Sequence, residues 1–375
     1  MTKKEKFNEL LKKDYVLLDG GMGTMLQASG MQVGETPEML NITDPKLIQS
    51  IHEKYFMAGS DIGIDLGTAN ILIYIKGQGI VLNEPSVVAI DMETKKPLAF
   101  GVEASDMLGK TPIKMNAIKP MKDGVIADFD ITLLMLNYFL NKVKGFGMFR
   151  KPRIVICCPA DTTAVEKNAI KEAAERLGAK KVYLEVEPKV AAIGVGLDIS
   201  KPTGNMVIDI GGGTTDIAVL SLGDIVTSKS LKIAGNVFDN DIKEYIKNKY
   251  KLLIGEKTAQ NIKHTIGSVY KGNKKNTMDV KGRDLTTGLP STIIINSSEV
   301  EEALKEDVEK IVEAAKSVLF DTPPELSADI VEKGAVLTGG ASLIDGLKEL
   351  LEEKLEIPIF NAENPLTSVA EGAGV

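Results

Sequence analysis

Two stretches of the chain repeat one pattern of apolar and polar positions. In each, an apolar run carries an aspartate at its end, passes through glycine and hydroxyl residues, and resumes as a second apolar run. The copies are Ile64–Asn70, followed by the apolar run Ile71–Ile75, and Met206–Asp216, followed by Ile217–Leu220. Two β-rich runs joined by a short glycine-containing segment are typical of a hairpin. The pattern therefore predicts two hairpins, each between buried strands.

The segments that follow the two copies also correspond. The matching pairs are the strands at 80–90 and 224–233, the strands at 153–158 and 335–338, the helices at 163–177 and 343–355, and the closing segments at 187–194 and 364–372. In the first of these helices, Val165, Ala169, Ala173 and Leu177 are expected on one face. Such an internal duplication predicts two like α/β domains that face each other, with a nucleotide held between the two hairpins.

The hairpin turns have the chemistry of a phosphate site. Glycine lets backbone N–H groups approach a polyanion without a Cβ in the way, and successive N–H groups form an anion-binding concavity. Asp65 and Asp209, at the ends of the first strands, are candidates to hold Mg2+ on the same phosphates, usually through water. The motif is not the GxxxxGK[ST] loop, which needs a lysine and leads into a helix. A single copy could equally be a ligand-free turn, but the second copy favours the phosphate site.

Composition excludes several classes of protein. The net charge of −7 argues against a general nucleic-acid binder, so no nucleic-acid partner is expected. The two cysteines are adjacent, Cys157 and Cys158, and cannot form a disulfide framework, which points to a reducing cytoplasm. No apolar run approaches the roughly 20 residues of a membrane span, and we expect no signal peptide. The two histidines lie far apart, and no spacing suggests a zinc site.

From residue 61 onward the chain resembles a known family. The matching runs are 61–70, 83–88, 120–128, 209–216, 282–290 and 322–326. The two hairpins resemble those of the actin, sugar-kinase and heat-shock-chaperone ATPase superfamily, and the full set of runs is similar to the MreB/Mbl family of bacterial actin homologues. The resemblance implies an actin-like α/β fold with two duplicated domains around a nucleotide cleft, at 61–200 (the first repeat) and 201–375 (the second repeat).

The resemblance also implies ATP and Mg2+ as cofactors and assigns roles to residues. Glu187 is expected to polarise the attacking water with help from the Thr214 hydroxyl, and Asp65 and Asp209 to hold the metal, through water. The residues expected to bind the nucleotide are Thr68, Ala69, Asn70, Gly211, Gly212, Gly213, Thr258, Ala259, Gln260, Lys263, Gly339, Gly340, Ala341 and Ser342. This chain departs from the family pattern at Gln260, where glutamate is usual, at Ala341, where glycine is usual, and at Asp216, where glutamate is usual.

The implied function is that of a cell-shape-determining ATPase that polymerises into membrane-associated filaments and organises cell-wall elongation. Its expected partners are further copies of itself and proteins of the MreC, MreD and RodZ type. Phe146, Met148 and Phe149 lie among basic residues, which suits an anionic membrane surface, so the filaments are expected on the inner face of the cytoplasmic membrane. The loop could instead fold back on its own domain. A small-molecule kinase of the same superfamily is the alternative function.

The first 60 residues do not belong to the duplication. The runs 18–25, 38–41, 51–55 and 58–61 resemble the opening βα unit of a homocysteine S-methyltransferase barrel. One such unit cannot close an eight-stranded barrel, and the family's late zinc-binding cysteines have no counterpart here, so methyltransferase activity is not expected. This segment is predicted to be a chimeric appendage. At the other end, relatives are expected to continue past Val375 into a terminal helix.

Overall fold

The computed structural model describes residues 61–144, 152–158, 162–176, 178–270 and 276–374. The chain divides into two units, Met1–Ala58 and Gly59–Val375, and the description below concerns the second. The predicted βα unit at 1–60 and the predicted membrane loop of Phe146, Met148 and Phe149 lie outside the described residues.

The first sheet is built around the first predicted hairpin. Its strand order is β10 (Lys181–Val186), β9 (Arg153–Cys158), β1 (Ile62–Leu66), β2 (Asn70–Ile75) and β3 (Gly79–Pro85). The strands β1 and β2 pair antiparallel and β1 and β9 pair parallel, so β1 lies at the centre. The first hairpin is thereby confirmed, and Asp65 sits on a central strand beside Cys157 of β9.

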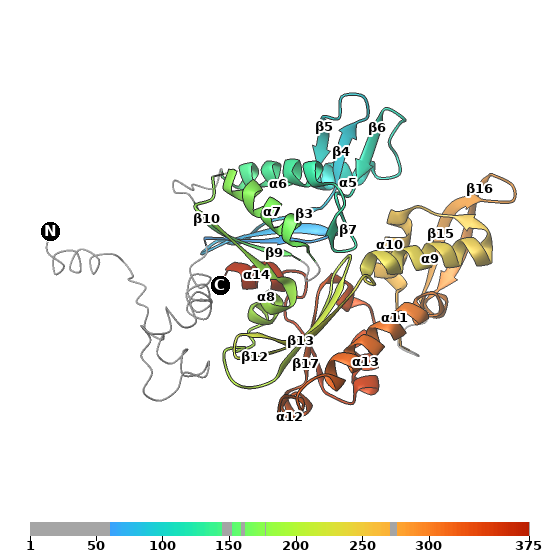
Figure 1. The fold of residues 1–375 in the computed structure, drawn as a ribbon. Helices are drawn as coiled ribbons and strands as arrows, with labels where there is room; N and C mark the ends of the chain where they lie inside the picture. Colours follow the sequence, from blue (N-terminus) through green and yellow to red (C-terminus); the bar gives the residue numbers. More distant parts are fainter. Residues whose placement is uncertain (1–60, 145–151, 159–161, 177, 271–275, 375) are drawn as a thin grey trace, which may run out of the picture. The chain divides into compact units, whose positions relative to one another are not determined.

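The second sheet repeats this arrangement strand by strand. In the same direction as the first sheet, its order is β18 (Ile359–Asn361), β17 (Ala335–Thr338), β11 (Asn205–Ile210), β12 (Thr215–Ser221) and β13 (Asp224–Leu231). The central strand β11 again pairs antiparallel with the next strand and parallel with β17, and Asp209 lies opposite Asp216 across the hairpin. The second hairpin is confirmed, and the common topology of the two sheets confirms the duplication (Figure 1).

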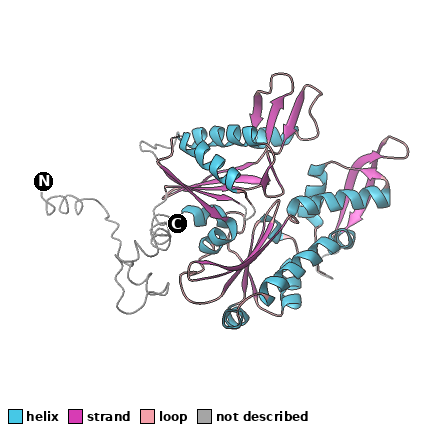
Figure 2. Cartoon of the chain, in the orientation of Figure 1, coloured by secondary structure: helices cyan, strands magenta, loops and turns pink. Residues whose placement is uncertain are grey.

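Helices and smaller sheets complete the unit (Figure 2). The helices are α5 (Gly101–Met107), α6 (Phe129–Lys144), α7 (Ala164–Arg176), α8 (Glu187–Gly194), α9 (Gly235–Tyr250), α10 (Glu256–Ile266), α11 (Ser297–Phe320), α12 (Pro324–Lys333), the 3-10 turn η1 (Gly340–Leu343), α13 (Leu347–Leu355) and α14 (Ser368–Gly374). The further strands are β4 (Val88–Asp91), β5 (Pro97–Phe100), β6 (Met115–Ile118), β7 (Met121–Lys122), β8 (Val125–Ile126), β14 (Leu252–Leu253), β15 (Thr277–Asp284) and β16 (Pro290–Asn296).

The closing helix of each repeat packs against the sheet of the other repeat. Helix α8 contacts β11 and β12, whereas α14 contacts β1, β2 and β9. The two helices also touch each other, and Figure 1 shows them between the two sheets. Small residues allow this approach: a Cβ on Gly194 would lie 1.8 Å from the Ser368 carbonyl oxygen, and one on Gly372 would lie 2.1 Å from that of Val190. The boundary between the two repeats at residues 200 and 201 stays a prediction, because α8 and α14 each pack against the sheet on the other side of it.

Three predicted elements differ from the structure. The strand expected at 80–90 is two strands of different sheets, β3 and β4, separated after Pro85, which has no N–H to continue the ladder. The helix expected at 343–355 starts at Leu347, because Gly346 before it has a positive φ of 82°. On α7 the predicted face is confirmed only in part: Ala173 is buried, but Val165 is 79% exposed and Ile170 faces the core as well, while Leu177 lies outside the described residues.

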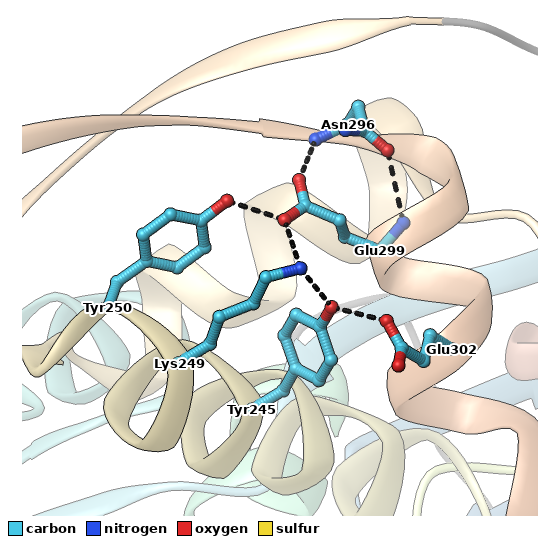
Figure 3. Close-up of polar contacts among 6 residues, drawn as sticks. All are labelled: Tyr245, Lys249, Tyr250, Asn296, Glu299 and Glu302. Carbon is cyan, nitrogen blue, oxygen red and sulfur yellow. Dashed lines mark hydrogen bonds and ion pairs between the residues drawn. The ribbon is translucent and has the colours of Figure 1, made fainter.

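A polar network joins the end of α9 to the start of α11 (Figure 3). The Lys249 ammonium donates to the Tyr245 hydroxyl at 2.8 Å and pairs with the Glu299 carboxylate at 2.9 Å. Tyr250 also donates to Glu299, and Glu299 forms a capping box with Asn296 at the N-terminus of α11. The capping box satisfies free N–H groups at the helix start. The network thus fixes the far end of α9, whose other end lies beside the second hairpin.

Candidate functional site

The turns of the two hairpins meet in the structure. A Cβ added to Gly212 would lie 2.4 Å from Cβ of Ala69, and one added to Gly213 would lie 2.4 Å from Oγ1 of Thr68. Real Cβ atoms do not approach this closely, so both positions need glycine for a reason independent of any ligand. The predicted residues of the two repeats are therefore brought together at the turns, as the duplication implied.

Hydrogen bonds hold each turn in shape. Oγ1 of Thr68 accepts from the buried N–H of Gly124 at 3.1 Å, and the Ser86 hydroxyl donates to the Gly67 carbonyl at 2.7 Å. In the second hairpin, the Gly211 N–H donates to the Thr214 carbonyl at 2.9 Å. The predicted catalytic hydroxyl of Thr214 thus belongs to a residue that is 7% exposed and whose backbone closes the turn.

Four carboxylates lie within electrostatic range of one another around these turns. Burial raises the pKa of Asp65 to about 7. Burial, with smaller effects from Asp216 and Asp65, raises the pKa of Asp209 to about 8. Burial also raises the pKa of Glu187 well above its ordinary value, with Asp216, Asp65 and Asp209 adding to the rise. Because like charges disfavour ionisation, a cation bound among these carboxyl groups would favour their charged forms.

Local structure explains how Glu187 reaches the cluster. It is the first residue of α8, directly after β10, and Pro188 occupies the first turn of that helix. Proline suits this position because the first N–H groups of a helix have no partner within the helix. Glu187 therefore follows the edge strand β10 directly, and it feels the charges of Asp216, Asp65 and Asp209.

A second group of predicted residues surrounds the start of α9. The Lys263 ammonium donates to the Gly235 carbonyl at 2.6 Å and pairs with the Asp239 carboxylate at 2.8 Å. An added Cβ on Gly235 would lie 3.4 Å from both Cβ of Ala341 and the Gly211 carbonyl oxygen. Lys263, Ala341 and the second hairpin are thus neighbours, and Lys263 is only 9% exposed.

The third predicted segment, at 339–342, packs on the same hairpin. Gly339 has φ of 87°, and a Cβ there would lie 2.3 Å from Oδ1 of Asp209. The Ser342 hydroxyl donates to the Gly339 carbonyl at 2.6 Å, which closes the turn. Glycine is required here both by the backbone conformation and by the approach of Asp209.

The predicted binding residues on α10 differ in their exposure to solvent. Ala259 is fully buried in the hydrophobic core of the second repeat, so its side chain cannot touch a ligand, whereas Gln260 is exposed and Thr258 is partly buried. Lys263, one turn further on, is the α10 residue that reaches the start of α9.

Sequence reasoning missed several charged residues near the site. Asp239 partners Lys263, and two ion pairs join α10 to the first repeat, Lys119 to Glu256 and Asp106 to Lys257. Asp239 could have been noticed from the sequence only because it lies one turn after Gly235, at the start of α9. The pairs across the repeats join residues 137 and 151 positions apart, and no local pattern indicates them.

The carboxylate cluster fits a metal held through water better than a metal held directly. Among the residues that the structure describes, no three histidine, cysteine or acidic side chains are arranged to ligate one ion. The half-buried Asp65 and the buried Asp209 nevertheless supply the oxygen donors that Mg2+ prefers, and Mg2+ usually keeps several waters. The donor set therefore suits a hydrated Mg2+ bound partly by another ligand.

Cys157 and Cys158 are both free and buried, and burial raises the pKa of Cys158 to about 11, which suppresses the thiolate form. Within the described part of the chain, no helix combines the length and apolar character needed to cross a membrane.

Comparison with protein families identifies the chain. Residues 59–375 match the model of the MreB/Mbl protein family, and residues 16–64 match that of homocysteine S-methyltransferase. The chain belongs to the MreB/Mbl family. Both predicted resemblances are confirmed, and the two matches overlap at residues 59–64, where the change of family was predicted.

Individual relatives agree with the family match. The chain is 60% identical over 319 residues to the cell shape-determining protein Mbl of Bacillus cereus, covering 85% of this chain and 96% of the relative. It is 50% identical over 323 residues to the cell shape-determining protein MreB of Escherichia coli K12, covering 85% and 93%. These relatives support the predicted place of this chain among cell-shape-determining bacterial actins.

A solved structure confirms the predicted actin-like fold. MreB5 of Spiroplasma citri bound to ADP has 41% identity and a TM-score of 0.79, and the match covers 83% of this chain and 94% of that one. The same protein has also been solved bound to AMPPNP, again with a TM-score of 0.79. At 41% identity over 94% of MreB5, the two proteins share much of their sequence as well as their fold.

Proposed function

We propose that this chain is an ATPase that binds ATP and Mg2+ between its two repeats and polymerises into filaments that determine cell shape. The observation that carries the proposal is the meeting of the two glycine hairpins, with Asp65, Glu187, Asp209 and Asp216 gathered around them. Relatives bearing the name cell shape-determining protein, and the nucleotide-bound MreB5 structures, support it.

Each residue has a defined task in this proposal. The turns of the two hairpins, Thr68 to Asn70 and Gly211 to Gly213, would face the phosphates, with the backbone N–H groups of Gly212 and Gly213 as donors, and Asp65 and Asp209 would hold a hydrated Mg2+. Bound Mg2+ supplies charge neutralisation of the phosphates. Glu187 accepts a hydrogen bond from the attacking water and orients it, and the Thr214 hydroxyl assists. Phosphoryl transfer needs little more from a protein than positioning and electrostatic stabilisation.

The remaining predicted binding residues are assigned to the nucleoside side. Lys263 of α10 and Ala341 of η1 both lie beside Gly235, next to the second hairpin. We assign them, with Thr258, Gln260 and the turn at 339–342, to contacts with the sugar and base. Ala259 is excluded as a side-chain contact, because its methyl group lies in the core.

The test separates assembly from hydrolysis. In Glu187→Gln the carboxylate is replaced by an amide of the same shape, so ATP-dependent sedimentation should persist while phosphate release falls by about 100-fold. Glu185→Gln is the matched control, because Glu185 lies two residues earlier and pairs with Lys189 at 3.1 Å. An unchanged rate in Glu187→Gln removes that residue from its role. Phosphorylation of an added sugar or other small alcohol in place of assembly would instead establish the kinase alternative.

Membrane association and partners extend the same proposal. The filaments are placed on the inner face of the cytoplasmic membrane through Phe146, Met148 and Phe149, with elongation proteins of the MreC, MreD and RodZ type as partners. Co-sedimentation with anionic liposomes should be lost in Phe149→Asp while ATP-dependent assembly without liposomes is retained. Equal liposome binding by the variant would contradict the loop's role.

A further inference from the structure

Two ion pairs join the first repeat to the start of α10 in the second. Lys257, in the first turn of α10, pairs with Asp106 at the end of α5 at a distance of 2.8 Å. Its neighbour Glu256, the first residue of α10, pairs with Lys119, which follows β6. The cation belongs to the first repeat in one pair and to the second repeat in the other. This reciprocal arrangement specifies one alignment of the two repeats, because a shifted alignment would place like charges together.

The pairs are connected to the site through α10. Lys263 of that helix donates to the Gly235 carbonyl, and the Gly235 N–H donates in turn to the Gly211 carbonyl of the second hairpin at 3.1 Å. Lys119 also acts on this group: burial raises the pKa of Asp239, and the positive charges of Lys263 and, more weakly, Lys119 oppose that rise. The charge of Lys119 in the first repeat therefore acts on Asp239, the partner of Lys263, which is assigned to the nucleoside.

The strength of the pairs suits a contact that opens and closes. The side chains of Lys119 and Glu256 are 27% and 45% exposed, and those of Lys257 and Asp106 are 39% and 70% exposed. Pairs with this much exposure are individually weak and are screened by salt. A permanent joint between the repeats would require burial that these four side chains do not have, whereas a reversible one requires only that the pairs form when the repeats approach.

We propose that the Asp106–Lys257 and Lys119–Glu256 pairs form a latch between the repeats that sets how long a nucleotide stays bound. The latch rests on the proposed nucleotide site but adds to it, since none of the four residues belongs to that site. The nucleotide leaves when both pairs have opened and the α10 side of the site moves away from the first repeat. Breaking either pair shortens the bound lifetime without removing a contact to the nucleotide.

The test measures dissociation of the fluorescent nucleotide mant-ATP from the full chain by stopped-flow chase with excess ATP. Asp106→Asn and Lys119→Gln should each raise the dissociation rate about threefold, and the double variant about tenfold. Raising NaCl to 1 M should bring the wild-type rate close to that of the double variant. Arg176→Gln is the control, because it breaks a pair of 2.6 Å with Glu172 that lies wholly within α7, and its rate should equal that of the wild type.

A charge exchange distinguishes the latch from a general loss of structure. Asp106→Lys alone should release mant-ATP faster than Asp106→Asn, and adding Lys257→Asp should restore a rate near that of the wild type. Carbodiimide coupling of Asp106 to Lys257, detected as a linked peptide by mass spectrometry, tests the contact without nucleotide. Unchanged dissociation in the double variant, with mant-ATP still bound, would overturn the latch. Failure of the wild type to bind mant-ATP would instead refute the proposed function.

Discussion

Replacing Asp209 by asparagine tests whether the carboxylate cluster opposes folding when no ligand is bound. Asp209 is 6% exposed, and its pKa is raised from 3.8 to about 8. At about 1.36 kcal/mol per unit, this shift corresponds to an upper limit of about 6 kcal/mol against the ionised form. Relaxation and water penetration reduce such penalties in real proteins, so we expect the nucleotide-free variant to be about 2 kcal/mol more stable than the wild type at pH 8.

The sign of the pH dependence follows from the direction of the shift. A carboxyl whose pKa is higher in the folded state holds its proton there after the unfolded chain has lost its own. Between about pH 4 and pH 8 the folded protein therefore binds more protons, and its free energy of unfolding falls as pH rises. Asp65, with a pKa of about 7, acts in the same direction over a narrower range. Asp209→Asn removes one of these contributions, so its stability should fall less steeply.

The assay is thermal unfolding by circular dichroism in EDTA, without nucleotide, at several pH values between 5 and 8.5. At pH 8 the variant should unfold about 4 °C above the wild type, and the two should converge towards pH 5. Asp279→Asn is the control, because Asp279 is exposed on β15. With saturating Mg2+ and ATP the wild type should unfold at the higher temperature, since only the wild type has the Asp209 carboxylate to help hold the metal. A variant that is no more stable than the wild type at pH 8, with the same pH slope, would refute this reasoning.

Three further predictions concern packing, the buried ion pair and the appended segment. Gly213→Val should lower the unfolding temperature by several degrees, because its side chain would enter the opposite hairpin, whereas Gly255→Ala, with nothing within 4 Å of an added Cβ, should be neutral by the same measurement. Lys263→Met should cost about 3 kcal/mol or more in urea unfolding, because it leaves the buried Asp239 carboxylate without its cation; a loss below about 1 kcal/mol would contradict that. Deleting residues 1–59 should leave mant-ATP affinity within about twofold, because the family match begins at residue 59, and a large loss in titration would show that the segment contributes to binding.

Local patterns were sufficient to predict the two hairpins. Each consists of contiguous residues in which apolar strands flank a glycine turn, and the antiparallel pairing of Asp209 with Asp216 follows directly from the length of that turn. The duplication was predictable for a related reason, since the same order of strands had to recur. The roles given to Glu187 and Thr214 came from the family resemblance and remain predictions.

Contacts between distant segments explain what could not be predicted. The apolar run at 80–90 looks continuous in the sequence, yet its halves pair with β2 and with β5 and β6, a difference set by tertiary structure. The exposed position of Val165 shows that the face of α7 that meets the sheet was also not evident from spacing alone. The ion pairs of α10 with Asp106 and Lys119 depend on side chains that look like ordinary surface charges in the sequence.

The hairpin contact is subject to two electrostatic terms that respond to different conditions. Asp209 and Asp216 are buried and Asp65 and Glu187 are half-buried, so salt screens this carboxylate cluster weakly, and a bound divalent cation would relieve its repulsion. The ion pairs at the start of α10 are partly exposed, so salt weakens them, and they involve none of the four carboxylates. Bound metal and nucleotide would therefore stabilise the contact by relieving the repulsion among the carboxylates. Higher ionic strength would instead weaken the contact by screening the ion pairs of α10. Separating the two effects requires that both salt and Mg2+ be varied, because a salt titration without Mg2+ acts mainly on the α10 ion pairs.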